Sequence, residues 1–407
     1  KKKELANDLY SVFENDDKDW KHILKTGNNK VNDHLSGTGI INKYPDIKMN
    51  YVGRKYSDIV KGIELKRPIF KEVEENNQQY FELHQNGLGE NNLIYTSVVL
   101  GDLINRCEDK ELQIYNALLV EEPEAHLHPQ YQNTFFQYLD KLQNKGLQIF
   151  ITSHSPTITA KSSIKNLIVL QKEDEFIAPF AFSILTESDF SEKNKRHLRK
   201  FLDTTKSQMF FSNGVLLVEG IAEAILLPVL AEKYLDVSID LEKEGIEIVN
   251  ISGVAFEHFA KFYNNDSEEK RLLSRCAIIT DSDPQKDKPK SDRSLNAEKM
   301  ERNNLLVRLA PNTLEHDLFE ESESNKKVMR IIYRSMHQET KDLEGDFTAE
   351  ILMQKLKSNK DKGDFALELR DTLNGDVSSE NDIPVELLKK FEVPAYLEDA
   401  IKWVARK

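Results

Sequence analysis

The sequence predicts an α/β fold in which strands of largely parallel sheets are covered by helices. Short apolar runs, such as residues 116–122 and 214–220, alternate with stretches of helical periodicity. These runs lack the polar–apolar alternation of a sheet with one wet face, so we expect strands buried on both faces. The alternation occurs in two separate parts of the 407 residues, which predicts at least two domains.

The composition is typical of a soluble globular protein, with 39% hydrophobic and 31% charged residues. No apolar run approaches the roughly 18 residues that a membrane span needs, and the charged start (residues 1–4) does not open a signal peptide. Cys107 and Cys276 stand in no metal-binding spacing, which favours a cytoplasmic protein. The net charge of −13 argues against a general nucleic-acid binder, although residues 192–201 and 282–293 are locally basic.

Several elements are expected in the first half of the chain. An amphipathic helix is predicted at 7–24, and a hairpin at 64–84 with Asn76 and Asn77 near its turn. The glycine-containing loop 85–92 opens an apolar helix from about Leu93. Then follow a strand at 116–122, a helix at 129–142 and strands at 147–155 and 166–171.

The second half repeats the alternation from about residue 205. Helical sequence is expected for most of 320–407, with charged connections. Before it come strands at 214–220, 246–253, 275–283 and 304–311, and a helix at 221–235.

The first group of candidate site residues lies at strand ends in the first half. Glu121 and Glu122 end one apolar run, and His154 follows the next strand. In P-loop ATPases of the ABC kind, a strand-end acid holds Mg²⁺ through water and the next acid orients the attacking water. Each feature alone is usually a solvated strand end or a surface histidine. Their order and spacing predict an ATP-hydrolysis site.

The second group is a set of carboxylates that suits a metal ion. Glu219 ends a strand and Glu223 lies one helical turn later, so the two come close together. Such proximity is unfavourable unless a cation lies between them. Asp281 and Asp283, in D-x-D spacing, project to the same side of an extended segment. Hard oxygen ligands of this kind favour Mg²⁺ or Mn²⁺.

Together these motifs resemble the OLD (overcoming lysogenisation defect) family, in which an ABC-type ATPase is fused to a Toprim domain. The Toprim pattern is a strand-end glutamate followed by glycine, with D-x-D about 60 residues later. Residues 250–256, with Ser252 and Gly253, resemble the family's small-residue turn near the metals. The resemblance covers roughly residues 80–370. It implies an α/β chain with an ABC-ATPase-like lobe, then a Toprim (Rossmann-like) domain and C-terminal helices.

The resemblance also implies domain limits. Residues 1–175 would be the C-terminal part of the ATPase, with a helical insert or dimerisation region near 1–60. Residues 176–210 would be a linker, and 211–407 the Toprim nuclease domain with a helical extension. No G-x-x-x-x-G-K-[ST] occurs in the 407 residues. Either the N-terminal lobe that carries this loop is missing from this stretch, or nucleotide binding has been lost; the absent initiator Met favours the first.

The function implied by the resemblance is a metal-dependent DNA endonuclease, regulated by its ATPase domain and used in antiphage defence. The implied partners are DNA, a second copy in a homodimer or higher oligomer, and an operon-encoded protein, without a membrane. Two Mg²⁺ or Mn²⁺ ions would be held for cleavage. The implied residues are Glu219, Glu223, Asp281, Asp283 and Glu315 for the metals, Lys362 for catalysis, and Glu121, Glu122, His154, Gly87 and Gly89 for ATP.

Two other classes stay open at this point. One is a different Toprim enzyme, a primase or a topoisomerase; a topoisomerase needs a tyrosine nucleophile, and the 13 tyrosines come with no recognisable companion domain. The other is an SMC/RecF-like DNA-binding ATPase without nuclease activity, which the intact acidic positions argue against.

Overall fold

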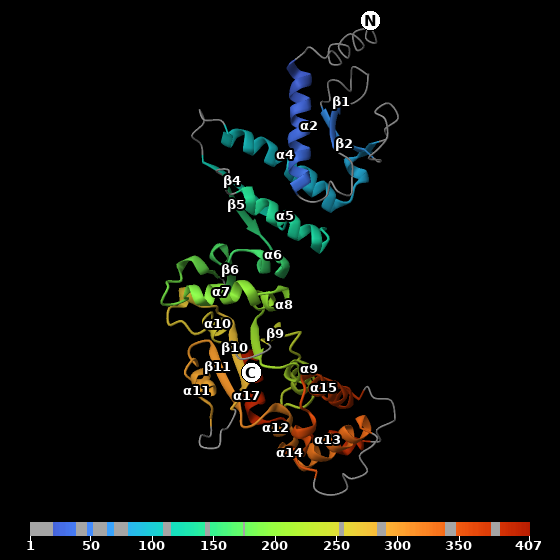
Figure 1. Cartoon of the computed structure of the whole chain (residues 1–407), viewed down its shortest axis with the longest axis vertical. Helices are drawn as coiled ribbons and strands as arrows, with labels where there is room; N and C mark the ends of the chain where they lie inside the picture. Colours follow the sequence, from blue (N-terminus) through green and yellow to red (C-terminus); the bar gives the residue numbers. More distant parts are fainter. Residues whose placement is uncertain are drawn as a thin grey trace. The chain divides into compact units, whose positions relative to one another are not determined.

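The computed structural model describes residues 19–37, 47–51, 63–68, 80–108, 115–142, 147–173, 176–251, 256–282, 290–337, 347–375 and 383–407. The chain divides into two compact units, Lys1–Lys161 and Ser162–Lys407 (Figure 1). No helix among the described residues is long and apolar enough to cross a membrane.

The first unit contains an antiparallel sheet and a parallel strand pair. β1, β2 and β3 form the antiparallel sheet, so the expected pairing within 64–84 is confirmed, while Asn76 and Asn77 lie outside the described residues. β4 and β5 pair in parallel, with Glu121 opposite Thr152. The elements are α2 (Asp19–Gly37), β1 (Lys48–Tyr51), β2 (Ile63–Pro68), β3 (Tyr80–Glu82), α4 (Leu88–Glu108), β4 (Asn116–Glu121), α5 (Pro129–Leu142), β5 (Leu147–Thr152) and α6 (Pro156–Lys161).

The core of the first unit forms where α2, α4 and α5 present their apolar faces. On α5, Phe135, Leu139 and Leu142 are buried at helical spacing. The strands beside this core are not covered on both faces. Leu119 is 75% exposed and Phe150, its partner in the register, is 48% exposed. The expectation of burial on both faces is therefore wrong for β4 and β5 in the described structure.

The second unit is built on a four-stranded parallel sheet, with the short antiparallel pair β6–β7 beside it. Its elements are β6 (Ile168–Glu173), β7 (Phe176–Ala181), α7 (Glu192–Phe201), α8 (Thr204–Ser207), β8 (Gly214–Val218), α9 (Ile221–Lys233), β9 (Ile246–Asn250), α10 (Phe256–Ala260), β10 (Arg275–Asp281), α11 (Asp292–Glu298), β11 (Leu305–Ala310), α12 (Leu314–Glu321), α13 (Glu323–Met336), α14 (Ala349–Lys355), α15 (Asn359–Asn374), α16 (Val385–Leu388) and α17 (Ala395–Ala405).

The strand order of this sheet, β11-β10-β8-β9, determines where a site can form. From β8 the chain moves to β9 at one edge, and from β10 it moves to β11 at the other. The order therefore reverses between β8 and β10. In open parallel sheets, ligands bind beyond the carboxyl ends of the strands at such a switch point. Glu219 follows β8 and Asp281 ends β10, so both lie at this position.

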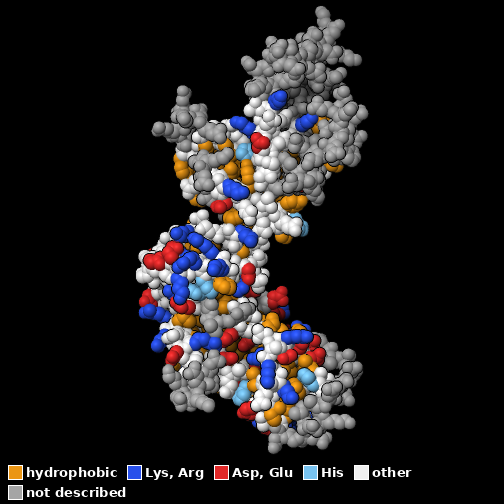
Figure 2. Space-filling view, viewed as in Figure 1, with side chains coloured by type: hydrophobic (Ala, Val, Ile, Leu, Met, Phe, Trp, Pro, Cys, Tyr) orange, Lys and Arg blue, Asp and Glu red, His pale blue; other side chains and the backbone are white. Residues whose placement is uncertain are grey.

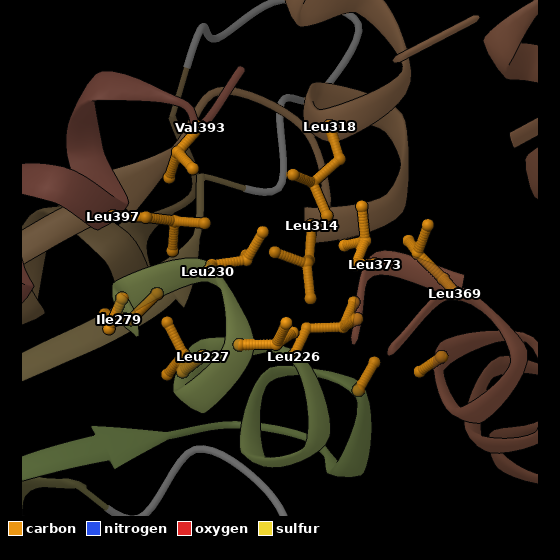
Figure 3. Packing of buried hydrophobic residues seen from close by; sticks show 14 of the residues in the cluster. Leu226, Leu227, Leu230, Ile279, Leu314, Leu318, Leu369, Leu373, Val393 and Leu397 are labelled. Atoms are coloured by element: carbon orange, nitrogen blue, oxygen red, sulfur yellow. The ribbon is translucent and has the colours of Figure 1, made fainter. Parts of the chain in front are cut away.

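Two apolar cores cover the two faces of the sheet. On one face, leucines of α9, α12, α15 and α17 pack together, with Ile279 of β10 at the edge of the cluster near Leu227 (Figure 3). Fully burying one such side chain stabilises the fold by about 1.5–3 kcal/mol. This packing holds together helices that are far apart in the sequence and that carry Glu223, Glu315 and Lys362.

The other face is covered by the segment expected to be a linker. Phe180, Phe182, Phe190 and Leu198 are buried against the opposite sides of β8 and β10. Residues 176–210 are therefore part of the second unit, and their aromatic residues explain why. A linker would leave these rings exposed to water, whereas here Phe182 packs edge to face against Phe180 and Phe262.

Candidate metal and nucleotide sites

The turn after β8 brings two glutamates to the switch point. Gly220 connects them, and a Cβ on it would lie 2.8 Å from Oε2 of Glu223, so a larger residue would displace this carboxylate. Glu223 is buried in the first turn of α9. Burial, together with the charges of Glu315 and Glu219, raises the pKa of Glu223 to about 7, against the opposing effects of a backbone hydrogen bond and Lys362.

Glu219 is held by two residues that the sequence analysis did not single out. Its Oε2 accepts a hydrogen bond from Thr280 Oγ1 at 2.7 Å and another from Arg293 at 3.1 Å. Arg293 comes from the first turn of α11 and belongs to the basic run 282–293. The run's charge was visible in the sequence, but its contact with Glu219 depends on how α11 packs on the sheet.

Glu315 and Lys362 meet across the helical layer. Thr313 caps α12 by accepting a hydrogen bond from the His316 amide, which places Glu315 in the first turn. The Glu315 side chain is 4% exposed, and its Oε2 accepts a hydrogen bond from Lys362 Nζ at 3.2 Å. Lys362 lies near the start of α15, behind a capping box made by Ser358 and Asp361.

Asp281 and Tyr396 complete the described part of this region. Tyr396, in the first turn of α17, was not expected as a site residue. Its hydroxyl oxygen is buried and has no hydrogen-bond partner among the described residues. Burial raises the pKa of Tyr396 well above its usual value, and the charges of Asp317, Asp281, Glu223 and Glu315 add to the increase. The phenol therefore lies within electrostatic reach of three of the predicted metal ligands.

The donor chemistry of this region fits a divalent cation. Carboxylates suit Mg²⁺ or Mn²⁺, and a glutamate whose pKa is raised by burial and by its acidic neighbours is stabilised in its charged form by a cation. In the described part of the chain, no three His, Cys, Asp or Glu side chains form a group that could hold an ion. Glu315 is paired with Lys362 and Glu219 with Arg293. Asp283, Ser252 and Gly253 lie outside the described residues.

A cavity of about 710 Å³ beside β9 is not part of this site. It is lined by residues such as Pro228, Glu232 and Asp240, and by none of the predicted metal ligands. We therefore place the candidate site at the switch point, where the functional groups are.

In the first unit, the predicted ATP-hydrolysis residues lie together at the end of the β4–β5 pair. The Glu122 amide donates to Thr152 O at 2.9 Å, which extends the strand pairing by one residue. Glu122 has a φ of 41°, in the left-handed region that glutamate rarely adopts. Its Oε1 lies 3.5 Å from His154 Nε2, and both side chains are exposed. Glu121 ends β4, and its main chain pairs with Thr152.

Glu124 supports this arrangement and was missed by the sequence analysis. Its Oε1 accepts hydrogen bonds from Ser153 Oγ and from the His154 amide, both at 2.7 Å, so it fixes the loop that carries the histidine. Its second carboxylate oxygen is buried and has no partner among the described residues. In the sequence, Glu124 is visible only as an acidic residue after Pro123, which is typical of a turn.

The two glycines differ in their surroundings. A Cβ on Gly89, in the first turn of α4, would lie 2.4 Å from the carbonyl oxygen of His126. This close approach joins α4 to the turn after β4. Gly87 precedes the helix and has open space around it. A groove of about 330 Å³ between α4 and β4 is lined by Asn92, Thr96, Glu121 and other residues.

These features define a protein with an ATPase-type region followed by a Toprim-type domain. Residues 1–159 match the AAA ATPase domain. Residues 210–283 match the TOPRIM domain of overcoming lysogenization defect protein-like proteins. The predicted resemblance to the OLD family is thereby confirmed.

The chain is similar to several individual proteins. Endonuclease GajA of Bacillus cereus (strain HuB5-5) is 25% identical over 393 residues, with 80% of this chain and 54% of that protein covered. The Old nuclease of Escherichia phage P2 is 27% identical over 175 residues, covering 42% and 30%. The solved C-terminal region of the Xanthomonas campestris pv. campestris OLD protein has 23% identity and a TM-score of 0.34, covering 49% of this chain and 95% of that structure. The chain spans about half the length, or less, of the curated relatives it matches.

Proposed function

We propose that this chain is the Toprim-bearing part of a divalent-metal-dependent DNA endonuclease that acts in antiphage defence under the control of its ATPase region. Two observations support the reaction class: relatives are named endonuclease and nuclease, and the TOPRIM match covers the turn after β8 and the end of β10. The observation that carries the proposal is the meeting of Glu315 and Lys362 beside Glu223 at the switch point.

Each group in this site has a proposed role. Glu219, Glu223, Asp281, Asp283 and Glu315 would hold Mg²⁺ or Mn²⁺. Bound ions would activate water and stabilise the leaving oxygen. The Lys362 ammonium would stabilise negative charge that develops on the phosphate during cleavage. Thr280 and Arg293 would keep Glu219 in position through their hydrogen bonds to its Oε2.

The DNA backbone would contact the basic helix α7 in the second unit. Lys and Arg side chains gather over this helix (Figure 2). Lys193, Arg196 and Lys200 are exposed and recur at one-turn spacing, which forms a positive stripe on a chain whose net charge is −13. Contacts of this kind supply affinity for DNA without sequence preference.

The first unit would regulate the nuclease through ATP. Glu121 would bind Mg²⁺, and Glu122 with His154 would act at the γ-phosphate. In the resembling ATPases this requires a lysine-bearing phosphate loop, and a second subunit closes the site with its signature loop. A homodimer is therefore part of the proposal, with Gly87 and Gly89 in the signature-loop position.

Incubation with supercoiled plasmid tests the function. The protein should convert the plasmid to nicked and linear forms with Mg²⁺ or Mn²⁺, and not with EDTA. Relaxed topoisomers without nicked product would instead indicate a topoisomerase. Binding of the plasmid by the protein without cleavage under every condition would instead indicate a DNA-binding ATPase. An Asp281→Ala variant prepared in parallel excludes a contaminating nuclease.

A further inference from the structure

The hydroxyl of Tyr396 is a buried donor that bonds to none of the described acceptors. Tyr396 follows Pro394 and Ala395 at the start of α17, a helix that packs on β8, β10 and β11. Its hydroxyl oxygen is buried without a hydrogen-bond partner among the described residues. Leaving such a group unsatisfied is energetically unfavourable. Most buried polar atoms in proteins have a hydrogen-bond partner, so an unpartnered one is unusual.

Two of the carboxylates whose charges act on Tyr396 accept hydrogen bonds from other donors. Glu315 accepts from Lys362 at 3.2 Å. Asp317 accepts from the amide and the side chain of Asn312, both at 3.1 Å. The last turn of α17 contacts the starts of β8 and β10, so its first turn, with Tyr396, lies towards the carboxyl ends of these strands.

We propose that Tyr396 is a positioning residue of the metal site, whose O–H donates to one of the carboxylate ligands once a divalent cation has drawn them together. The inference rests on the proposed function and deepens it. Carboxylates that bind a metal are themselves held by hydrogen bonds from outer residues, and loss of such a partner typically weakens metal binding 10–100-fold. Tyr396 supplies a further donor, in addition to Lys362, Thr280 and Arg293.

A role as nucleophile fits the structure less well. A tyrosine that attacks a phosphate needs an open approach to the reacting phosphorus atom, whereas this hydroxyl oxygen is covered. A protonated phenol is also a weak nucleophile but a good hydrogen-bond donor. Burial and nearby negative charges disfavour loss of the proton from Tyr396.

Titration calorimetry with Mn²⁺ tests the proposal on the whole chain. Tyr396→Phe removes the hydroxyl and keeps the ring. We expect the Kd for Mn²⁺ to rise at least about 10-fold. The melting temperature in EDTA should be unchanged or higher, because an unsatisfied polar atom has been removed. Tyr263→Phe is the matched control, since it removes another buried hydroxyl from the opposite core of the same unit and should leave the Kd unchanged.

The outcomes separate this inference from the nuclease proposal. An unchanged Mn²⁺ Kd in Tyr396→Phe, or an equal loss in Tyr263→Phe, would overturn the positioning role. A covalent DNA adduct formed by the unaltered protein and absent from Tyr396→Phe would overturn it in favour of a nucleophile. If the unaltered protein binds Mn²⁺ and Tyr396→Phe weakens that binding, the inference stands even when plasmid is not cleaved, and only the nuclease proposal fails.

Discussion

Lys362 Nζ lies 3.2 Å from Glu315 Oε2, although 47 residues separate the two in the sequence. The contact joins the start of α15 to the first turn of α12 and lies beside the buried Glu223. A lysine in this position can neutralise part of the acidic cluster at the switch point. It can also meet the phosphate of a bound nucleic acid.

Replacing Lys362 should affect the rate of cleavage more than DNA binding. If its ammonium stabilises transition-state charge, Lys362→Ala should lower the nicking rate by about 10²-fold or more. One lost phosphate contact is a small part of the total affinity for DNA. Single-turnover nicking and DNA titration measure the two effects, with Lys360→Ala, an exposed lysine on the same helix, as control. Weaker binding with an unchanged maximal rate would assign Lys362 to backbone contact alone.

Removal of Asp281 should abolish cleavage and leave the fold intact. Asp281→Ala deletes a proposed metal ligand at the end of β10 and no apolar core volume. Nicking should fall to background, while the melting temperature in EDTA stays within about 3 °C, as for other substitutions outside the core. Asp364→Ala, at an exposed position of α15, is the control. Cleavage at the normal rate by Asp281→Ala would remove the basis of the metal-site assignment.

The basic helix α7 should contribute to DNA affinity through charge. In Arg196→Ala/Lys200→Ala, the slope of log affinity against log salt should decrease by about 2, since two phosphate contacts are lost. The loss should be equal for unrelated DNA sequences. Fluorescence anisotropy at several salt concentrations measures the slope. Lys389→Ala/Lys390→Ala removes the same charge from another exposed segment, and an identical decrease there would show only a net-charge effect.

The second unit should lose stability on acidification because of His258. This side chain is buried, hydrogen-bonded to Asn194 and stacked on His197. Burial, with the nearby charge of His197, lowers the pKa of His258 to about 4. Below the unfolded value of about 6.5 the unfolded chain binds a proton that the folded chain does not, so stability falls as the pH drops from about 6.5 towards 4, by on the order of 2–3 kcal/mol.

Urea unfolding of the second unit between pH 7 and pH 4.5 measures this dependence. His258→Gln should flatten the profile in this window, since the titrating group is gone. His337→Gln, at an exposed position, should leave the profile as it is. A profile of the same slope in His258→Gln would assign the acid sensitivity to other groups.

ATP hydrolysis should require more than the residues of this chain. Glu122 can orient water only beside a loop that holds the phosphates, and no G-x-x-x-x-G-K-[ST] occurs in the 407 residues. We expect phosphate release at background levels from residues 1–407. In a form that carries such a loop, Glu122→Gln should permit ATP binding and block turnover. Robust hydrolysis by residues 1–407 alone would contradict the assignment of Glu121 and Glu122.

The sequence was sufficient for the features that depend on local order along the chain. Strand ends marked by acidic residues, the helix at 129–142 and the spacing from Glu219 to Asp281 are consecutive patterns, and parallel strands necessarily bring such ends to one edge of a sheet. One turn of helix was expected to bring Glu219 close to Glu223, whereas the structure places Glu219 before Gly220, the N-cap of α9. Glu122 and His154 were expected at one site because they follow the ends of two parallel strands. The structure places their side chains 3.5 Å apart.

Only the tertiary structure decided which donor each of these carboxylates meets. Thr280 and Arg293 reach Glu219, and Lys362 reaches Glu315, because the apolar cores on the two faces of the sheet fix how α11, α12 and α15 pack. The aromatic residues of 176–210 likewise belong to the apolar core, because they pack against one face of the sheet. The burial of a side chain and its pairing with a distant residue depend on contacts between segments that are far apart in the sequence. The spacing of residues along the chain therefore does not predict them.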